Sequence, residues 1–189
     1  LAWMLADEYL QGKYVQHLDK LCELAEKEVY RTRHQPAVQE VAKSYLKQFR
    51  RCRQLFEDCR HRLLDCFIEL MKTGNLEIMA SAATHGYLPL LSVNPKAVEA
   101  QIAIGIETYR HFFGKDPKGF WLPECGFAPG IDDILTQYGI SYVILDSHGI
   151  LHGEPRPRYS VFAPVYTPGG LAAFGRDWES SKQVWSAWE

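Results

Sequence analysis

The chain has 189 residues, 47% of them hydrophobic and 23% charged, and a formal net charge of −2. This is the composition of a globular chain long enough to bury a core. The weak net charge gives no electrostatic footprint for nucleic acid or for an anionic membrane, so we expect neither as a partner.

The five cysteines are odd in number and contain no CxxC pair, which argues against a disulfide framework and favours a reducing, cytoplasmic compartment. Cys52, Cys59 and Cys66 recur every seven residues. This spacing predicts that they lie along one stripe of a helix, as small core residues.

The first part of the chain has the periodicity of amphipathic helices. Helical patterns cover residues 2–11, 14–33 and 36–72, the last as one helix or two. Gly12 is expected to end the first pattern, and Gly74 to cap the last one. The chain starts at Leu1 inside such a pattern, and we interpret both of its ends as cut, so that it is a fragment of a longer protein.

From residue 75 onward, short apolar runs alternate with helical patterns. Strands are expected over 76–83, 119–122, 141–146, 161–166 and 171–174, and helices over 94–114 and 129–138. This alternation favours a parallel α/β sheet, either open or closed into a barrel.

Glu124 is the principal catalytic candidate. It lies in the segment GFWLPECGF (119–127), directly after an apolar strand that carries Trp121. Ligands bind at the carboxyl ends of parallel strands, and Gly126 would allow a tight turn there. The alternative is a structural glutamate that complements the dipole at the start of a helix. Position alone does not separate the two.

Two other segments carry polar or aromatic groups after apolar runs. His85 follows the first run and could bind a sugar hydroxyl or a carboxylate, although a structural turn histidine is the simpler interpretation. Arg176 and Asp177 follow the last run, where Asp177 could equally cap a helix. The same segment continues to Trp185 and Ser186. His148 and His152 lack a suitably spaced third ligand, so no metal site is expected.

These residues carry a family likeness. The run WLPECG (121–126) resembles a motif of glycoside hydrolase family 57 α-glucan branching enzymes. The segments THGYLPLL (84–91) and FGRDWESSKQVWS (174–186) are similar to other segments of these enzymes, as is the helical first part of the chain.

The resemblance implies an α/β fold, part of an incomplete (β/α)7 barrel, with a helical insertion over 1–73 and the barrel portion over 74–189. It implies a retaining α-1,4-glucan transferase that forms α-1,6 branches, with Glu124 as nucleophile and His85 in the donor subsite. Trp121, Arg176, Asp177 and Trp185 are the other expected substrate-binding residues. No metal or organic cofactor is implied.

The same resemblance implies that the acid/base aspartate lies outside this chain, because the family segment that carries it has no match here. An α-amylase or a 4-α-glucanotransferase of the same family would use the same nucleophile, so both remain alternatives. A further alternative is a catalytically inactive glucan-binding fragment, which would need the aromatic side chains but not Glu124.

Overall fold

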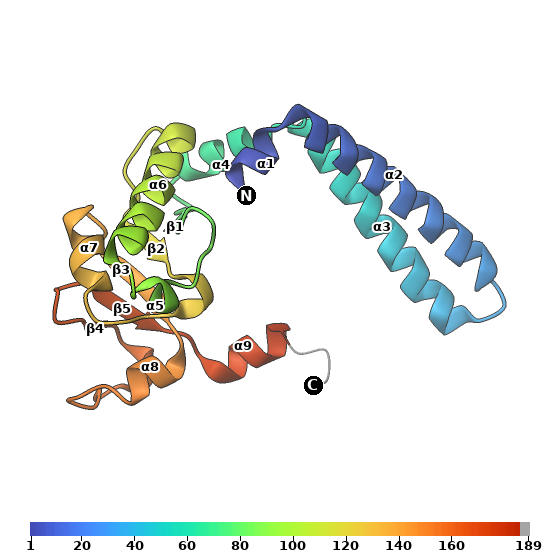
Figure 1. Ribbon diagram of the computed structural model, residues 1–189. Helices are drawn as coiled ribbons and strands as arrows, with labels where there is room; N and C mark the ends of the chain where they lie inside the picture. The colour runs from blue at the N-terminus through green and yellow to red at the C-terminus, as the bar shows by residue number, and fades with distance from the viewer. Residues whose placement is uncertain (186–189) are drawn as a thin grey trace. The chain divides into compact units, whose positions relative to one another are not determined.

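The computed structural model describes residues 1–185 (Figure 1). The chain divides into two compact units, Leu1–Leu76 and Glu77–Glu189. The first contains helices alone among its assigned elements, whereas the second carries a mixed α/β sheet. None of the helices within residues 1–185 combines the length and the apolar character that a membrane crossing would require.

The first unit is built around a helical hairpin. Its helices are α1 (Ala2–Ala6), α2 (Glu8–Arg31), α3 (Pro36–Asp58) and α4 (Leu63–Lys72). The carboxylate of Asp7 caps α2 by accepting from the Leu10 amide at 2.9 Å. The expectation that Gly12 ends a helix is wrong, because α2 continues through it. One glycine costs a helix only about 1 kcal/mol, which the packing of α2 against α3 can offset.

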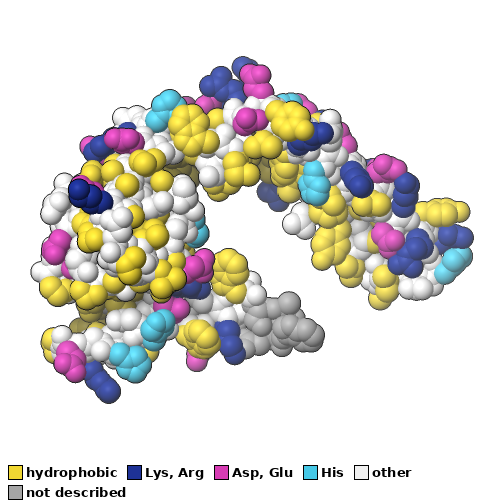
Figure 2. Space-filling model, viewed as in Figure 1, with side chains coloured by type: hydrophobic (Ala, Val, Ile, Leu, Met, Phe, Trp, Pro, Cys, Tyr) yellow, Lys and Arg dark blue, Asp and Glu magenta, His cyan; other side chains and the backbone are white. Residues whose placement is uncertain are grey.

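The two long helices are joined by a tight turn before Pro36, which takes the first position of α3. Thr32 is fully buried there, and its hydroxyl donates to the Glu28 carbonyl at 2.7 Å. The side-chain amide of Gln39 donates across the turn to the Val29 carbonyl at 3.0 Å. Figure 2 shows charges of both signs over this hairpin, with hydrophobic side chains gathered along part of it.

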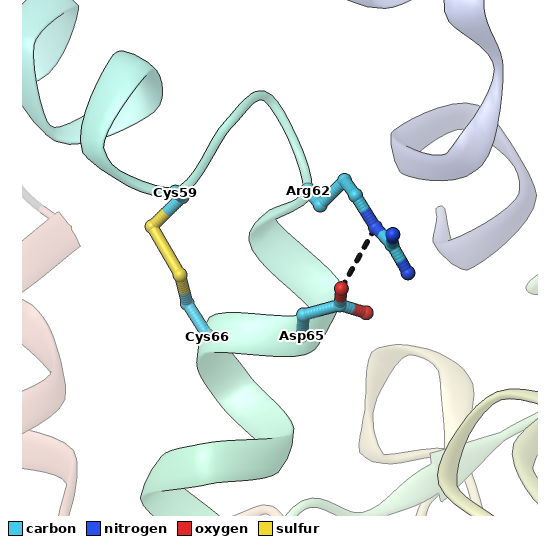
Figure 3. The surroundings of a disulfide bond; sticks show 4 residues. All are labelled: Cys59, Arg62, Asp65 and Cys66. Atoms are coloured by element: carbon cyan, nitrogen blue, oxygen red, sulfur yellow. Dashed lines mark ion pairs between the residues drawn. A yellow bond between two sulfur atoms is a disulfide. The ribbon is translucent and has the colours of Figure 1, made fainter.

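The helical pattern over 36–72 forms two helices, because the backbone reverses between Asp58 and Leu63. Arg60 (φ 51°) and His61 (φ 64°) adopt left-handed conformations that end α3. Cys59 and Cys66 lie on either side of this reversal and form a disulfide (Figure 3). The prediction that these two cysteines share a single helix stripe is therefore wrong, and so is the expectation of a chain without disulfides.

The second unit contains a five-stranded sheet in the order β1-β2-β3-β5-β4. The strands are β1 (Ala80–Ser81), β2 (Gly119–Trp121), β3 (Tyr142–Leu145), β4 (Val165–Tyr166) and β5 (Ala172–Gly175). Strands β1, β2, β3 and β5 run parallel, and β4 pairs antiparallel with β5 at one edge. The predicted parallel α/β sheet is thus present, although β1 is much shorter than the expected run over 76–83.

Helices and short turns follow and connect these strands. They are α5 (Leu88–Leu91), α6 (Pro95–Phe113), α7 (Ile131–Gln137), α8 (Ser147–Leu151) and α9 (Trp178–Trp185), with 3₁₀ turns η1 (Pro123–Cys125) and η2 (Ser160–Phe162). The turn η2 replaces the first part of the strand expected over 161–166. Helix α6 packs against β1 so closely that a Cβ on Gly105 would lie 2.0 Å from the Ser81 carbonyl oxygen.

The core of this unit lies between the sheet and α6 and α7. Each strand of the parallel part places apolar side chains in it, and α6 supplies a buried face. The residues that are almost fully buried include Phe120, Val143, Ala173, Val98, Ile102, Ile106 and Leu135. Because the core fixes the strands, it also fixes the loops that follow them.

Candidate functional site

The candidate residues gather at one edge of the sheet. His85 follows β1, Glu124 follows β2, and Arg176 and Asp177 follow β5. Because these three strands run parallel, their carboxyl ends lie at the same edge. In α/β folds this edge is where ligands bind.

Glu124 is presented to solvent by an unusual backbone. It lies in the 3₁₀ turn η1 with φ 53° and ψ 27°, and Cys125 follows with φ 54°. The Glu124 side chain is 79% exposed. A non-glycine residue in the left-handed region is uncommon, and such strain concentrates at active sites and ligand-binding loops. A turn of three residues carries little dipole, so the structural alternative for this glutamate has weak support.

His85 lies opposite Glu124 and also has a left-handed backbone, with φ 56°. Its Nε2 atom is 3.7 Å from Oε1 of Glu124, and its side chain is 53% exposed. This distance is too long for a direct hydrogen bond, so the carboxylate stays accessible. The structure thus brings together the two residues that follow β1 and β2.

The loop that carries His85 is held by α6. The Ala83 amide donates to the Gln101 carbonyl at 3.0 Å. The side chain of Gln101 accepts from the Thr84 amide at 3.0 Å and donates to the Thr84 hydroxyl at 2.9 Å. Three bonds to one residue of α6 therefore fix the backbone just before His85.

A second contact joins the loops of His85 and Glu124. A Cβ on Gly126 would lie 2.2 Å from the ring of Tyr87, so this ring rests directly on the Gly126 backbone. Gly126 itself has ordinary extended angles (φ −76°, ψ 124°). The role expected for this glycine, a tight turn, is therefore replaced by another one, which is to leave room for an aromatic ring.

Trp121 is the last residue of β2 and is half-buried. Its carbonyl oxygen accepts a hydrogen bond from the Ser81 hydroxyl at 2.9 Å. Ser81 also lies 3.5 Å from Nδ1 of His85. Neither Ser81 nor Tyr87 stood out in the sequence. Ser81 lies within the first apolar run, but its contact with Trp121 depends on the pairing of β1 with β2, which the sequence pattern does not give.

Arg176 and Asp177 differ in their contacts. Nη1 of Arg176 lies 3.7 Å from Sγ of Cys125, so this side chain reaches the residue next to Glu124. Asp177 instead caps α9, where its carboxylate accepts from the Ser180 hydroxyl and from the Ser180 amide at 2.9 Å. The hydrogen bonds from Ser180 lower the pKa of Asp177, so this group stays ionised and is poorly suited to donate a proton.

Trp185 lies at the end of α9 and is 81% exposed. Within residues 1–185 it forms no hydrogen bond, ion pair or ring contact with Glu124 or His85. Trp178 begins the same helix and is 58% exposed. The two rings are seven residues apart and so lie on the same face of α9. Ser186 lies outside the described residues.

The histidine and acidic residues do not form a metal site in the part of the chain that the structure describes. Within residues 1–185 no three His, Cys, Asp or Glu side chains lie together as a metal site would require. His148 lies 3.9 Å from the carboxylate of Asp146, which itself accepts from the Ser147 amide at 2.7 Å as the cap of α8.

The fold and the edge residues define a parallel α/β protein that presents a carboxylate and an imidazole at the carboxyl ends of neighbouring strands. The family model "Glycosyl hydrolase family 57" matches residues 4–184. The chain therefore belongs to this family, as the resemblance indicated.

Individual relatives agree with this membership. The 1,4-alpha-glucan branching enzyme TK1436 of Thermococcus kodakarensis is 32% identical over 99% of this chain and 31% of its own length. The alpha-amylase AmyC of Thermotoga maritima is 42% identical, with a TM-score of 0.85 over 98% of this chain and 36% of its own. A GH57-type branching enzyme of Pyrococcus horikoshii is 32% identical, with a TM-score of 0.83 over 96% of this chain and 36% of its own. The chain thus spans about a third of the length of these relatives.

Proposed function

We propose that this chain is the nucleophile-bearing part of a retaining α-glucan transferase, a 1,4-α-glucan branching enzyme, with Glu124 as the nucleophile. The observation that carries the proposal is the exposed, strained Glu124 at the carboxyl end of β2, opposite His85, in a chain of glycosyl hydrolase family 57. In this proposal the sheet is part of an incomplete (β/α)7 barrel, and residues 1–73 are a helical insertion.

The proposed chemistry follows from the position of Glu124. Its carboxylate attacks the anomeric carbon of an α-1,4-linked glucose unit, the C1–O bond breaks, and a glycosyl-enzyme ester forms. The leaving oxygen needs a proton from a second carboxyl group about 5–5.5 Å from the first. Asp177 is not this acid, because its lowered pKa and its capping role keep it ionised. We assign the acid to an aspartate that this chain does not include.

The remaining edge residues are proposed to hold the glucan. His85 would bind the donor sugar beside Glu124. Trp121, Arg176, Asp177 and Trp185 would supply further polar and stacking contacts. The exposed ring of Trp185 suits the apolar face of a pyranose. A neutral polymer also fits a chain whose net charge is only −2. No metal or organic cofactor takes part in this proposal.

A second candidate is α-amylase activity, in which water resolves the glycosyl-enzyme ester instead of a sugar 6-hydroxyl. The 42% identity to AmyC favours this candidate. A 4-α-glucanotransferase would use a 4-hydroxyl at the same step. All three share the nucleophile, and they differ in how the acceptor is bound and how water is excluded.

The test is a Glu124→Gln variant of the full-length polypeptide that contains this chain, incubated with amylose. We expect the variant to lose turnover by roughly 10³-fold or more, because the amide cannot form the ester. Glu99→Gln is the matched control, since Glu99 lies exposed on α6. New α-1,6 linkages, released by a debranching enzyme, would identify branching, and new reducing ends without branches would identify an amylase.

The same variant separates catalysis from binding alone. If wild-type protein bound amylose without turnover, and Glu124→Gln bound it equally well, the glucan-binding alternative would replace the proposal. Turnover that survives in Glu124→Gln would rule out Glu124 as the nucleophile.

A further inference from the structure

We propose that the Ser81 hydroxyl sets the tautomer of His85, so that the neutral imidazole carries its proton on Nδ1 and presents the lone pair of Nε2 toward Glu124. Ser81 is then a positioning residue that acts through His85. The tautomer follows from the geometry alone, and only its catalytic consequence rests on the proposed function.

The available protons determine the tautomer. The Ser81 hydroxyl has one hydrogen, and the Trp121 carbonyl oxygen, 2.9 Å away, can only accept. The hydroxyl hydrogen is therefore committed to Trp121. Toward Nδ1 of His85, 3.5 Å away, the Ser81 oxygen can then only accept. A neutral imidazole has one N–H, so a proton on Nδ1 leaves Nε2 as a lone pair.

The position of the Ser81 oxygen is set by the sheet and not by the loop. Ser81 is the register partner of Trp121 in the β1–β2 pair. Its carbonyl packs against Gly105 of α6, where even one additional methyl group would clash. The Trp121 carbonyl lies on the neighbouring strand, so donor and acceptor are held by two strands of one parallel sheet. The tautomer is thus fixed by rigid elements.

The tautomer of His85 determines what Nε2 can offer to Glu124. Its Oε1 atom lies 3.7 Å from Nε2, and small movements could close this gap. An Nε2–H group would then donate to the carboxylate and compete with its attack on carbon. A lone pair on Nε2 cannot do this. It leaves the carboxylate unbound, and it can accept a hydrogen bond from a sugar hydroxyl of the donor instead.

The tautomer can be measured without any activity. The chain is labelled with ¹⁵N-histidine, and the imidazole nitrogens are observed by NMR near pH 8, above the ordinary histidine pKa of ~6.5. A His85→Gln variant identifies the signals of His85. We expect wild type to show its non-protonated nitrogen at Nε2. In Ser81→Ala the non-protonated signal should move to Nδ1, because the Nε2–H form predominates in free histidine.

Two further variants sharpen this measurement. Ser81→Thr keeps the hydroxyl and should keep the wild-type tautomer, which a loss of packing alone would not explain. Ser92→Ala is the matched control, since the Ser92 hydroxyl donates to the Leu88 carbonyl at 3.0 Å, and it should leave the His85 signals unchanged. A wild-type spectrum with the proton on Nε2 would overturn the proposal, and so would an unchanged tautomer in folded Ser81→Ala. If Ser81→Ala does not fold, the spectra of wild type and Ser81→Thr still show which nitrogen of His85 carries the proton.

The catalytic consequence has a separate readout. In the full-length polypeptide, Ser81→Ala should lower kcat on amylose by about 10- to 100-fold, the range found when the outer partner of a metal-bound histidine is removed. Ser81→Thr should restore it. An unchanged kcat in a variant with the altered tautomer would overturn the role in catalysis. Turnover retained by Glu124→Gln would instead defeat the proposed nucleophile and leave the tautomer measurement intact.

Discussion

Glu124, Cys125 and His85 all adopt left-handed backbone conformations without being glycine. Each such residue costs on the order of 1–3 kcal/mol, and surrounding contacts must hold it in place. For His85 these contacts are the three hydrogen bonds that join Ala83 and Thr84 to Gln101, two donated by backbone amides and one by the Gln101 side chain. For Glu124 the packing of Tyr87 on Gly126 does the same on the other side.

We predict that Gly126→Ala lowers the free energy of unfolding of the unit that contains the sheet. Its new methyl group would lie 2.2 Å from the Tyr87 ring, and overpacking of this kind typically costs ~1–3 kcal/mol. Urea denaturation followed by circular dichroism measures the loss. In a Tyr87→Ala background the same substitution should be nearly neutral, and an equal loss there would show that the ring is not the cause.

A second glycine gives a prediction of the opposite sign. Gly12 lies inside α2, and Gly12→Ala, with no atom within 4 Å of its new methyl group, should stabilise the chain by ~0.5–1 kcal/mol in the same denaturation measurement.

Among the secondary-structure elements, the turn between β4 and β5 is attached to the start of α7 by one side chain. Asp132 is only 4% exposed, and it accepts from the Gly169 amide at 2.9 Å. Burial opposes its ionisation, but hydrogen bonds from the Gly169 amide and the Thr167 hydroxyl outweigh this effect and lower the pKa of Asp132. The antiparallel edge of the sheet is thus joined to a helix through a charged hydrogen-bond acceptor.

This lowered pKa has a definite sign for stability. The Asp132 carboxylate stabilises the folded state fully above its unfolded pKa of ~3.9, and this contribution is lost as the pH falls through the lower folded pKa. Asp132→Asn should therefore cost roughly 1–3 kcal/mol at pH 7. The deficit should shrink as the pH drops below about 4, because the unfolded wild-type chain then binds a proton that the folded carboxylate takes up only at its lower pKa.

Denaturation curves between pH 7 and pH 3 measure this convergence. Asp133→Asn is the matched control, because Asp133 is the exposed neighbour on the same turn of α7. A deficit of Asp132→Asn that stayed constant over this range would mean that its charge does not matter.

Sequence patterns located several elements whose ends or cores carry a local signal, although Gly12 and the run over 161–166 were misleading. Pro36 begins a helix, Gly114 ends α6 in a left-handed conformation, and the apolar run SYVILD contains β3. The helix break at Arg60 and His61 has no such signal, since it depends on left-handed residues that are not glycine. The length of β1 was also not predicted. It is set by the pairing with β2, which is limited to Ala80 and Ser81.

The residues of the candidate site also fall into those that a local sequence pattern predicts and those that it does not. Position after an apolar run was enough to nominate Glu124 and His85, and the structure places them 3.7 Å apart. The role of Ser81 depends on the register between β1 and β2, and that of Tyr87 on a ring contact between loops about forty residues apart. Such contacts between distant residues are set by tertiary packing, and the hydrophobic periodicity of the sequence does not predict them.

For the whole molecule, the chain matches only 31% to 36% of the length of the relatives described above. The proposed mechanism needs two carboxyl groups, and the proposal finds one of them, Glu124, in this chain. General acid catalysis is typically worth ~10²–10⁴-fold.

We therefore predict that the 189-residue chain by itself turns over amylose at least ~10²-fold more slowly than the full-length polypeptide does. The comparison is made by counting reducing ends and α-1,6 linkages at equal molar concentration. Circular dichroism of the 189-residue chain must first show that it is folded. Equal rates for the two would mean that the acid lies within this chain and that its assignment is wrong.

The strained backbone of His85 and Glu124 also bears on directed evolution. Glycine adopts φ values near 55° without steric cost, so glycine at either position would relieve strain while deleting the proposed functional group. A library screened for heat resistance alone should therefore enrich glycine at both sites. If the proposed function holds, such variants lose activity as they gain stability, so variants of this chain have to be selected for both at once.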